Sequence, residues 1–345
     1  MIFVNNPGDW GHLSWPFEHA EWHGWTPTDL IFPFFLFIVG VAGALSLEKR
    51  AAAGASGAEL ARHAFRRGMT IALVGWLLAW FPFTLERLSR LRIPGVLPRI
   101  GVVFVLGTWI VLACGRRRWV VLAATLLLLA LHTLLATGLG YDLTREGNLQ
   151  RALDLALLKG HLWKKDWDPE GILSTLTSVA TMLTGTLTGW WLTSARPLGE
   201  RLRTLAAAGA LTALAGQLLH PLLPINKNLW TASYVLLTSG LAALTLAFCL
   251  YLCDVKSWRL SFFTTFGTNP LLAFVLSGLL AKLLGLVKWT AAGGKLVSLH
   301  AFLYRAAFSW LPQRTLASHA WALLEVLLFW GILRVFEKRG WFWKV

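Results

Sequence analysis

The chain has 345 residues, of which 56% are hydrophobic and only 14% charged, and its mean hydropathy is +0.58. Because a soluble domain carries about 25% charged residues, and the deficit extends along the whole chain, this composition excludes a soluble protein with a single membrane anchor. The net charge of +15 lies in short basic loops, as expected of a membrane protein, and no RNA-binding motif or zinc-finger spacing accompanies it, so we expect no nucleic-acid partner.

Apolar runs of roughly 20 residues recur along the chain, and each is long enough to cross a ~30 Å hydrocarbon layer. Inside lipid every backbone N–H and C=O group must be satisfied within the element, which leaves helices or closed barrels. Barrel strands would alternate polar and apolar residues over about ten positions, and the run at 120–136, "VVLAATLLLLALHTLLA", does not alternate. The sequence therefore predicts an all-α polytopic transmembrane helix bundle, with residues 1–345 forming a single domain in contact with membrane lipid.

Nine complete spans are expected in chain order, and two segments differ from them. Residues 141–170 are predicted to form an amphipathic surface segment. The stretch 282–315 is mixed and fits either an interfacial helix or one more span, because Lys288, Lys295 and a glycine pair interrupt it. The predicted spans lie near 26–47, 69–85, 95–113, 119–140, 171–193, 203–222, 229–252, 261–281 and 316–337.

The orientation follows from the basic loops. Alternating spans place the C-terminal tail on the same side as 48–68, 114–118, 194–202 and 253–260, a side with 17 basic and 5 acidic residues against 15 and 11 on the other. The bias is sharpest in short loops such as "CGRRRW", where the positive-inside rule is most reliable. We expect this side and the C-terminus to be cytoplasmic, so that "HAEWHGW" (19–25) faces outward.

The first residues, "MIFVNNPG", resemble the outer end of a helix whose beginning is missing. They are too short to span a membrane and lack the basic region and apolar core of a signal peptide. We expect the coding region to extend upstream and to encode roughly 20 more residues, mostly apolar.

The three cysteines, Cys114, Cys249 and Cys253, lie in or at the ends of apolar runs. No histidine or acid stands near them at metal-ligand spacing, so the sequence predicts buried thiols and neither a disulfide framework nor a metal site.

Ionisable and amide groups at membrane depth are candidates for function by default. His132 and Glu325 stand alone in apolar surroundings, where an interhelical hydrogen bond is the favoured interpretation. The remaining candidates stand beside proline breaks or at the starts of spans, and they are Asp29, Arg99, Asn226, Lys227, Asn228 and Asn269.

A histidine at the outer interface is the clearest chemical group. His19 stands between Glu18 and Glu21, directly before a span. A neutral imidazole can act as a base or nucleophile near neutral pH, and a neighbouring carboxylate can orient it. Spacing alone does not choose among His12, His19 and His23, and the sequence holds no GxSxG, Walker or HExxH motif.

Six motifs in collinear order resemble the heparan-α-glucosaminide N-acetyltransferase family, a group of transmembrane acetyltransferases whose lysosomal member acetylates the terminal glucosamine of heparan sulfate. They are "VNNPG…HAEWHGWTPTDLIFPFFLFIVG", "RIPGVLPRIG", "DPEGILSTLTS", "PINKNLWTASYVLLTSG", "GTNPLLAF" and "FWKV". The resemblance implies ten or eleven helices, a homodimer, acetyl-CoA entering from the cytosol and an acceptor amine on the far side. For a bacterial member it implies the inner membrane, an amino-sugar acceptor and no metal.

The resemblance also assigns residues. The family's catalytic histidine lies in the motif that reads "HAEWHG" here, which singles out His19, and a family asparagine matches Asn5. The family's first helix, with an "LDxFRG"-like stretch at its cytoplasmic end, has no counterpart in this sequence. Within this scheme Arg62, Arg66 and Arg67 would hold the phosphates of acetyl-CoA by charge-assisted contacts, with Arg99 as a further contact. Asn5 or Asn269 would stabilise the thioester oxyanion, and the acceptor would meet Asp29, Asn226, Lys227, Asn228 and Asn269.

Two other classes of function stay open. A transporter of amino sugars or sugar fragments would also use intramembrane polar groups and helices broken at Pro33, Pro98 and Pro270, although the sequence shows no convincing internal repeat. An assembly subunit without turnover would show scattered polar residues and no pocket. A transferase instead requires a path from the cytoplasmic face to His19.

Overall fold

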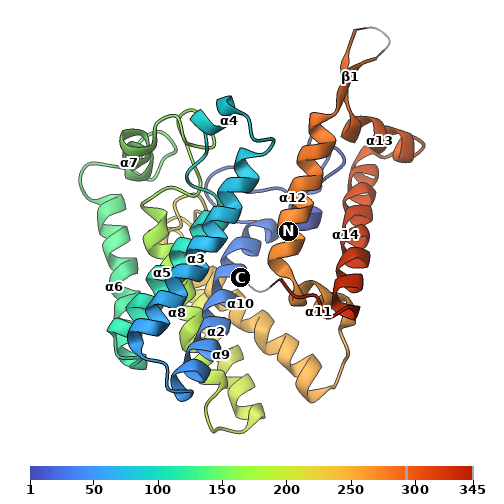
Figure 1. The fold of residues 1–345 in the computed structure, drawn as a ribbon. Helices are drawn as coiled ribbons and strands as arrows, with labels where there is room; N and C mark the ends of the chain where they lie inside the picture. The colour runs from blue at the N-terminus through green and yellow to red at the C-terminus, as the bar shows by residue number, and fades with distance from the viewer. Residues whose placement is uncertain (292–293, 344–345) are drawn as a thin grey trace. The chain divides into compact units, whose positions relative to one another are not determined.

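The computed structural model describes residues 1–291 and 294–343 and is mainly helical (Figure 1). Its helical architecture agrees with the predicted fold class. The chain divides into two compact units. The central unit comprises Ala20–Trp25 and Asp29–Ser257, and the terminal unit comprises Met1–His19, Thr26–Thr28 and Trp258–Val345. The single domain expected from the sequence stays a prediction.

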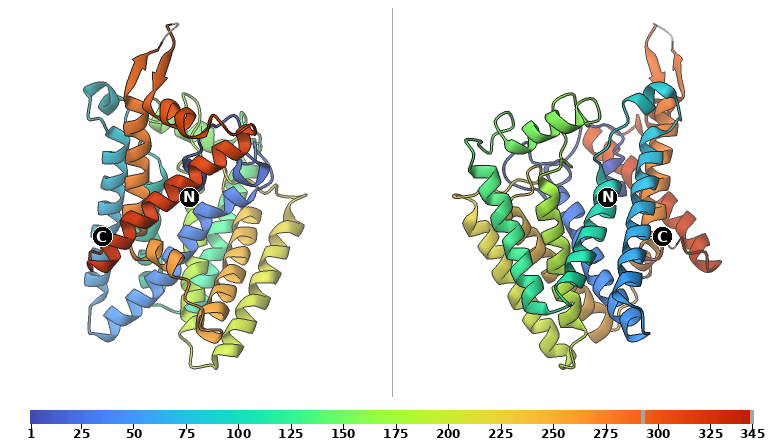
Figure 2. Two further views of the ribbon diagram at one scale, coloured as in Figure 1. Left: turned by 90° about the vertical axis from the view of Figure 1, so that its right-hand side faces the viewer. Right: turned by 60° about the vertical axis from the view of Figure 1, so that its left-hand side comes forward.

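The central unit is a bundle of long helices joined by short turns (Figure 2). Helix α2 packs against α8, α3 against α5, α9 against α10, and α6 against α8. Two short helices, α4 and α7, lie at the end of this unit away from the turn between α2 and α3 (Figures 1 and 2). The helices are α2 (Ile31–Ala52), α3 (Gly57–Trp80), α4 (Leu85–Ser89), α5 (Val96–Ala113), α6 (Arg118–Thr137), α7 (Leu149–Leu158), α8 (Ser174–Leu192), α9 (Leu198–Leu219) and α10 (Ala232–Leu250), which continues as a π-helical turn, Tyr251–Val255.

The terminal unit combines the first residues of the chain with its last third. Helix α1 (Ile2–Asn5) packs against α14 (Arg314–Lys338), and the N–H of Gly8 donates to the carbonyl of Ser318 at 3.2 Å. The chain then passes through a 3₁₀ turn at Trp15–Phe17. The other elements are α11 (Ser261–Thr268), α12 (Pro270–Leu286), the antiparallel strands β1 (Lys288–Thr290) and β2 (Leu296–Ser298), and α13 (Leu299–Phe308).

Six helices of the described residues are long and apolar enough to cross a membrane, and α11 with α12 make a seventh if this pair, bent by 84°, counts as one span. The nine to eleven spans expected from the sequence are not confirmed. Two expected spans coincide with helices that fall short of this test. Helix α3 carries several charges in its first half, and α8 is rich in Thr and Ser and mostly buried inside the unit. A helix shielded from lipid by its neighbours does not need an apolar surface.

The predicted alternation of loops is visible within the central unit. The turns between α2 and α3, between α5 and α6, and between α8 and α9 lie at one end (Figures 1 and 2), and these are the short basic loops of the sequence. The α2–α3 turn ends in a capping box, in which Glu59 N–H donates to Ser56 Oγ at 3.3 Å and Ser56 N–H donates to Glu59 Oε2 at 2.7 Å. Reciprocal capping of this kind satisfies N–H groups that the first turn leaves without partners.

Helices α2 and α8 touch through their backbones. A Cβ atom on Gly185 would overlap the carbonyl oxygen of Phe37, and one on Gly40 would overlap the carbonyl oxygen of Met182. The "GTLTG" sequence at 185–189 is therefore part of a helix contact, as small residues at four-residue spacing often are in membrane proteins.

This contact predicts a strong effect for Gly185→Ala. The added methyl group has to push α2 and α8 apart, and overpacking of this kind costs about 1–3 kcal/mol. Gly331→Ala in α14 is the matched control, because no atom lies within 4 Å of its Cβ position and Ala favours a helix by about 1 kcal/mol over Gly. Thermal unfolding in detergent should show a lower midpoint for Gly185→Ala alone. Equal midpoints for Gly185→Ala and the wild type would contradict the contact.

Candidate active site

The carboxylate of Asp29 is buried where the first apolar helix begins, with 1% of the residue exposed. Its Oδ1 lies 3.3 Å from Lys227 Nζ, and its Oδ2 accepts the N–H of Ala20 at 3.0 Å. The Tyr234 hydroxyl donates to the Asp29 carbonyl at 2.5 Å. Because a buried charge is costly unless it is paired and hydrogen-bonded, the contacts to Lys227 and Ala20 explain how an acid is retained next to the apolar residues 31–40.

Lys227 stands on a tightly organised loop between α9 and α10. The Asn226 amide closes this loop, since its Oδ1 accepts the N–H of Leu229 at 2.8 Å while the Asn226 N–H donates to Thr231 Oγ1 at 3.1 Å. Trp230 has a positive φ of 53°, a conformation uncommon for a bulky residue. Its indole N–H donates to Thr181 Oγ1 at 3.0 Å. The sequence therefore folds "PINKNLW" into a rigid platform that presents Lys227.

A second buried polar cluster lies at the α4 and α7 end of the central unit. Arg92 pairs with Asp168, whose Oδ2 accepts the Arg92 Nε–H at 2.8 Å, and with Glu170. Burial lowers the pKa of Arg92, but Asp168 and Glu170 outweigh it and hold that pKa above its ordinary value. Burial raises the pKa of Asp154 to about 6. The motif "DPEGILSTLTS" thus contributes Asp168 and Glu170 to a buried ion cluster, a role that its residue spacing did not reveal.

His19 and Asn5 both belong to the terminal unit, and both side chains are exposed. Asn5 is the last residue of α1, while its neighbour Asn6 is buried and donates to the carbonyl of Ile2 at 3.0 Å. His19 follows the 3₁₀ turn and directly precedes Ala20, the residue whose N–H binds Asp29. These positions leave both catalytic assignments as predictions.

The two alternative histidines have partners of their own. His12 Nδ1 lies 2.9 Å from Asp9 Oδ2. His23 Nδ1 lies 3.3 Å from the Asn226 amide nitrogen. Burial and the neighbouring His220 lower the pKa of His23, which favours its neutral form.

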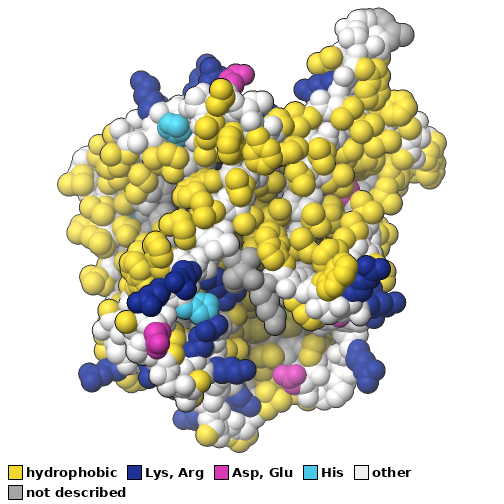
Figure 3. All heavy atoms as spheres, viewed as in Figure 1, with side chains coloured by type: hydrophobic (Ala, Val, Ile, Leu, Met, Phe, Trp, Pro, Cys, Tyr) yellow, Lys and Arg dark blue, Asp and Glu magenta, His cyan; other side chains and the backbone are white. Residues whose placement is uncertain are grey.

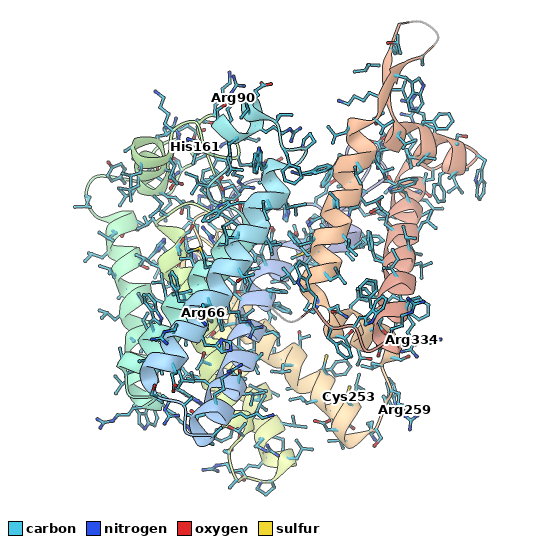
Figure 4. All side chains as sticks on the ribbon, viewed as in Figure 1. Arg66, Arg90, His161, Cys253, Arg259 and Arg334 are labelled. Atoms are coloured by element: carbon cyan, nitrogen blue, oxygen red, sulfur yellow. The ribbon has the colours of Figure 1, made fainter. Side chains whose placement is uncertain are left out.

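The predicted donor-binding arginines divide into two environments. Arg62, Arg66 and Arg67 are exposed on α3, and the Arg67 guanidinium lies 5.2 Å from the Phe104 ring centre. Lys and Arg side chains gather over the end of the central unit where α2 meets α3 (Figure 3), and Arg66 projects from α3 (Figure 4). Such a surface suits phosphate groups.

Arg99 does not join this group. It is 3% exposed, its Nη2 donates to the Gly171 carbonyl at 2.8 Å and to Ser174 Oγ at 2.6 Å, and its guanidinium lies 5.4 Å from the Trp230 ring centre. Its Nε and Nη1 have no hydrogen-bond partner among the described residues. Its environment is therefore an internal one, beside the platform that carries Lys227.

The amide of Asn269 has backbone partners, whereas Asn228 is bonded through its own backbone carbonyl. Asn269 is buried at the break between α11 and α12, where its Nδ2–H donates to the Trp341 carbonyl at 3.1 Å and its Oδ1 accepts the Trp343 N–H at 2.7 Å. The carbonyl of Asn228 accepts a hydrogen bond from Gln150 at 3.1 Å. Asn269 thus fastens the C-terminal tail within the terminal unit.

His132 and Glu325 each form a hydrogen bond with a nearby residue. His132 hydrogen-bonds the backbone of Leu229, and Glu325 Oε1 accepts the indole N–H of Trp321 at 3.0 Å. Leu229 lies in the loop between α9 and α10, and Glu325 bonds one turn away on α14, so the interhelical bonds favoured by the sequence stay a prediction. The three cysteines are free thiols. Within the described ranges, 1–291 and 294–343, no three His, Cys, Asp or Glu side chains gather at metal-binding distance.

These features define a helical membrane protein whose central unit buries a carboxylate–ammonium pair. No model of a known protein family matches the chain. It is 26% identical over 407 aligned positions to heparan-α-glucosaminide N-acetyltransferase of Mus musculus, covering 100% of this chain and 58% of the relative. It is 29% identical over 337 positions to the Homo sapiens protein of that name, covering 80% of this chain and 50% of the relative.

The chain is therefore a homologue of proteins named heparan-α-glucosaminide N-acetyltransferase, and this similarity confirms the resemblance seen in the sequence motifs. It spans about half the length of these relatives.

The Asp29–Lys227 pair predicts a non-additive mutational pattern. Lys227→Met leaves an uncompensated buried carboxylate, and breaking a buried pair from one side costs about 3–5 kcal/mol. The double variant Asp29→Asn/Lys227→Met should lose clearly less free energy of unfolding than the sum of the losses in the two single variants. Chemical unfolding in detergent measures the free energy of unfolding of the two single variants and of the double variant.

The exposed pair Arg196–Glu200 provides the control, because a surface ion pair contributes about 0–1 kcal/mol. Glu200→Gln should therefore leave the unfolding midpoint nearly unchanged. Strict additivity of Asp29→Asn and Lys227→Met would show that the two charges do not stabilise each other.

Proposed function

We propose that the protein is a membrane acetyltransferase that moves the acetyl group of cytosolic acetyl-CoA to the amine of a glucosamine-type sugar on the outer side. The observation that carries the proposal is the buried Asp29–Lys227 pair, linked through Asp29 to Ala20, the residue that follows His19. The names of the two relatives support the same chemistry. Acetyl-CoA is a substrate in this scheme.

The reaction forms one amide bond and breaks one thioester bond. In direct transfer, His19 accepts a proton from the acceptor ammonium or amine, the nitrogen attacks the acetyl carbonyl, and the C–S bond breaks to release the CoA thiolate, which takes up a proton. In the two-step route, a nitrogen of neutral His19 attacks the acetyl carbonyl and the C–S bond breaks to release the CoA thiolate. The amine then attacks the acetyl-histidine, the bond between acetyl and imidazole breaks, and the amine proton passes to the imidazole. Both routes place negative charge on the carbonyl oxygen.

An amide N–H directed at that oxygen would stabilise the transition state, and removal of one such donor costs about 2.7–4 kcal/mol in a well-characterised protease. Asn5 fills this role in the proposal. Asn269 is a weaker candidate, since its amide already holds the backbone of Trp341 and Trp343. Lys227 would contact the acceptor sugar, while Asn226, which is fully buried, would hold the loop that presents it.

The donor would bind at the basic end of α3. Arg50, Arg66 and Arg67 all act electrostatically on His63, so these three cations lie near one another. The exposed Arg62 lies on α3 with Arg66 and Arg67. Three phosphate groups of acetyl-CoA suit such a surface. The proposal includes a bacterial inner-membrane location, a cytoplasmic C-terminus and a homodimer.

We predict that His19→Ala lowers acetyl transfer by about 10²-fold or more, the usual size of a general-base contribution, while the unfolding midpoint stays close to that of the wild type because the side chain is exposed. The assay follows labelled acetyl from acetyl-CoA to glucosamine in detergent. His12→Ala and His23→Ala should retain most activity. Turnover of His19→Ala at the wild-type rate would remove His19 from the mechanism.

We predict that replacing both Arg66 and Arg67 with Gln raises the KM for acetyl-CoA and leaves the KM for glucosamine unchanged. The reason is the loss of two charge-assisted contacts to phosphate. Arg203→Gln is the control, because Arg203 is an exposed basic residue on α9. An unchanged KM for acetyl-CoA in the double variant would assign Arg66 and Arg67 to membrane orientation instead.

One observation favours transport as a second candidate. Helices α11 and α12 meet at an 84° bend with Pro270 at the break, and discontinuous helices are common in transporters. Uptake of labelled glucosamine into proteoliposomes without acetyl-CoA would support transport. Accumulation of N-acetylglucosamine only when acetyl-CoA is present would support transfer.

A further inference from the structure

Gln150 is a buried amide that bridges three parts of the central unit. It lies in α7, and 1% of the residue is exposed. Its Nε2 donates to the carbonyl of Asp168 at 3.2 Å and to the carbonyl of Asn228 at 3.1 Å, and its Oε1 accepts the N–H of Ser174 at 3.1 Å. Both of its donors and its acceptor are therefore used.

One side of this bridge is a rigid base, which we call the outer segment (residues 141–171). Asp168 within it also accepts the N–H groups of Trp163 and Glu170, at 2.8 and 2.9 Å. His161, labelled in Figure 4, directs its Nδ1 to the carbonyl of Leu91 at 2.8 Å, and the Ile93 N–H donates back to the His161 carbonyl at 2.9 Å. Together with Arg92, these bonds anchor the outer segment to residues 91–93.

The other side of the bridge is the loop of Lys227. Asn228, whose carbonyl Gln150 holds, is the next residue after Lys227. The outer segment also reaches the chain near Ala20, since the Trp22 indole N–H donates to the carbonyl of Leu143 at 2.8 Å and its ring packs edge-on against Trp167 at 5.1 Å. The loop that carries Lys227 and the chain near Ala20 are thus both tied to the outer segment.

We propose that Gln150 is a positioning residue that fixes the loop at 226–231, and with it Lys227 against Asp29, for the acetyl transfer described above. The inference rests on that proposed function. Reacting groups need placement within ~0.5 Å, and a displacement of about 1 Å can cost ~10²-fold in rate. Loss of the bond to the Asn228 carbonyl loosens the loop without removing any group that touches substrate.

Two substitutions test the bridge. Gln150→Met keeps the length of the side chain and removes all three hydrogen bonds. Gln150→Glu keeps an acceptor for the Ser174 N–H but has no N–H for the Asn228 carbonyl. Asn148→Ala is the matched control, because Asn148 is also a buried amide, caps α7 through Arg151 N–H, and otherwise bonds the carbonyls of Thr144 and Arg145 within the outer segment.

The first readout is backbone hydrogen exchange of residues 226–231 in detergent, which does not depend on activity. In Gln150→Met and Gln150→Glu these amides should exchange several-fold faster than in Asn148→Ala. Each variant is measured at the same number of degrees below its own thermal unfolding midpoint. The second readout is acetyl transfer to glucosamine. The KM for glucosamine should rise about tenfold, in line with the loss of one or two hydrogen bonds, with the KM for acetyl-CoA unchanged.

The outcomes separate this inference from the proposed function. If the wild type transfers no acetyl group, the proposed function fails, while the exchange data still test the bridge. Equal exchange in the Gln150 variants and Asn148→Ala overturns the bridge. Faster exchange with wild-type KM values overturns the positioning role, and so does an equal KM change in Asn148→Ala.

Discussion

A carboxylate at the start of an apolar helix is stable only when a cation and hydrogen-bond donors face it. Asp29 imposes this requirement on the central unit. Its carboxylate pairs with Lys227, almost 200 residues further along the chain, and accepts the backbone N–H of Ala20, while the Tyr234 hydroxyl donates to the backbone carbonyl of Asp29. Three segments must therefore be held in fixed positions relative to one another before this buried charge is stable. The platform and the outer segment hold them there.

The requirement extends from Asp29 to residues that carry no charge. Trp230 holds a left-handed backbone conformation in a platform that bonds to Thr181 and packs against Arg99 and Phe32. Strained conformations persist only where the surroundings over-determine them. The platform thus stores strain beside the acid, as functional sites often do.

The sequence predicted the helical class and several members of this site, and the limits of that prediction have physical causes. Asp29, Asn226 and Lys227 stood out because polar residues beside apolar spans are rare. Gln150 did not, because an amide in an amphipathic surface segment has the pattern of a solvated residue, and its burial depends on partners 18 to 78 residues away. Asn269 looked like a site residue because nothing in its motif indicates that the tail at Trp341–Trp343 returns to it.

Span number was the least predictable feature for a related reason. Hydropathy detects contact with lipid, while α8 faces other helices and keeps Thr and Ser along its length. The catalytic assignments of His19 and Asn5 come from motif resemblance, since exposed side chains in a loop and at the end of a one-turn helix leave no pattern that spacing can detect.

The glycine contacts have a mechanical consequence for the bundle. Besides Gly40 and Gly185, the backbones of α3 and α5 meet at Gly68 and Gly101, and those of α9 and α10 meet at Gly216 and Gly240. Two helices that touch backbone to backbone interlock, so neither can slide by a turn or rotate without separating. Each of these helix pairs therefore moves as one rigid body. Any opening of the central unit has to occur where these pairs meet other helices through side chains, as α6 does on α8.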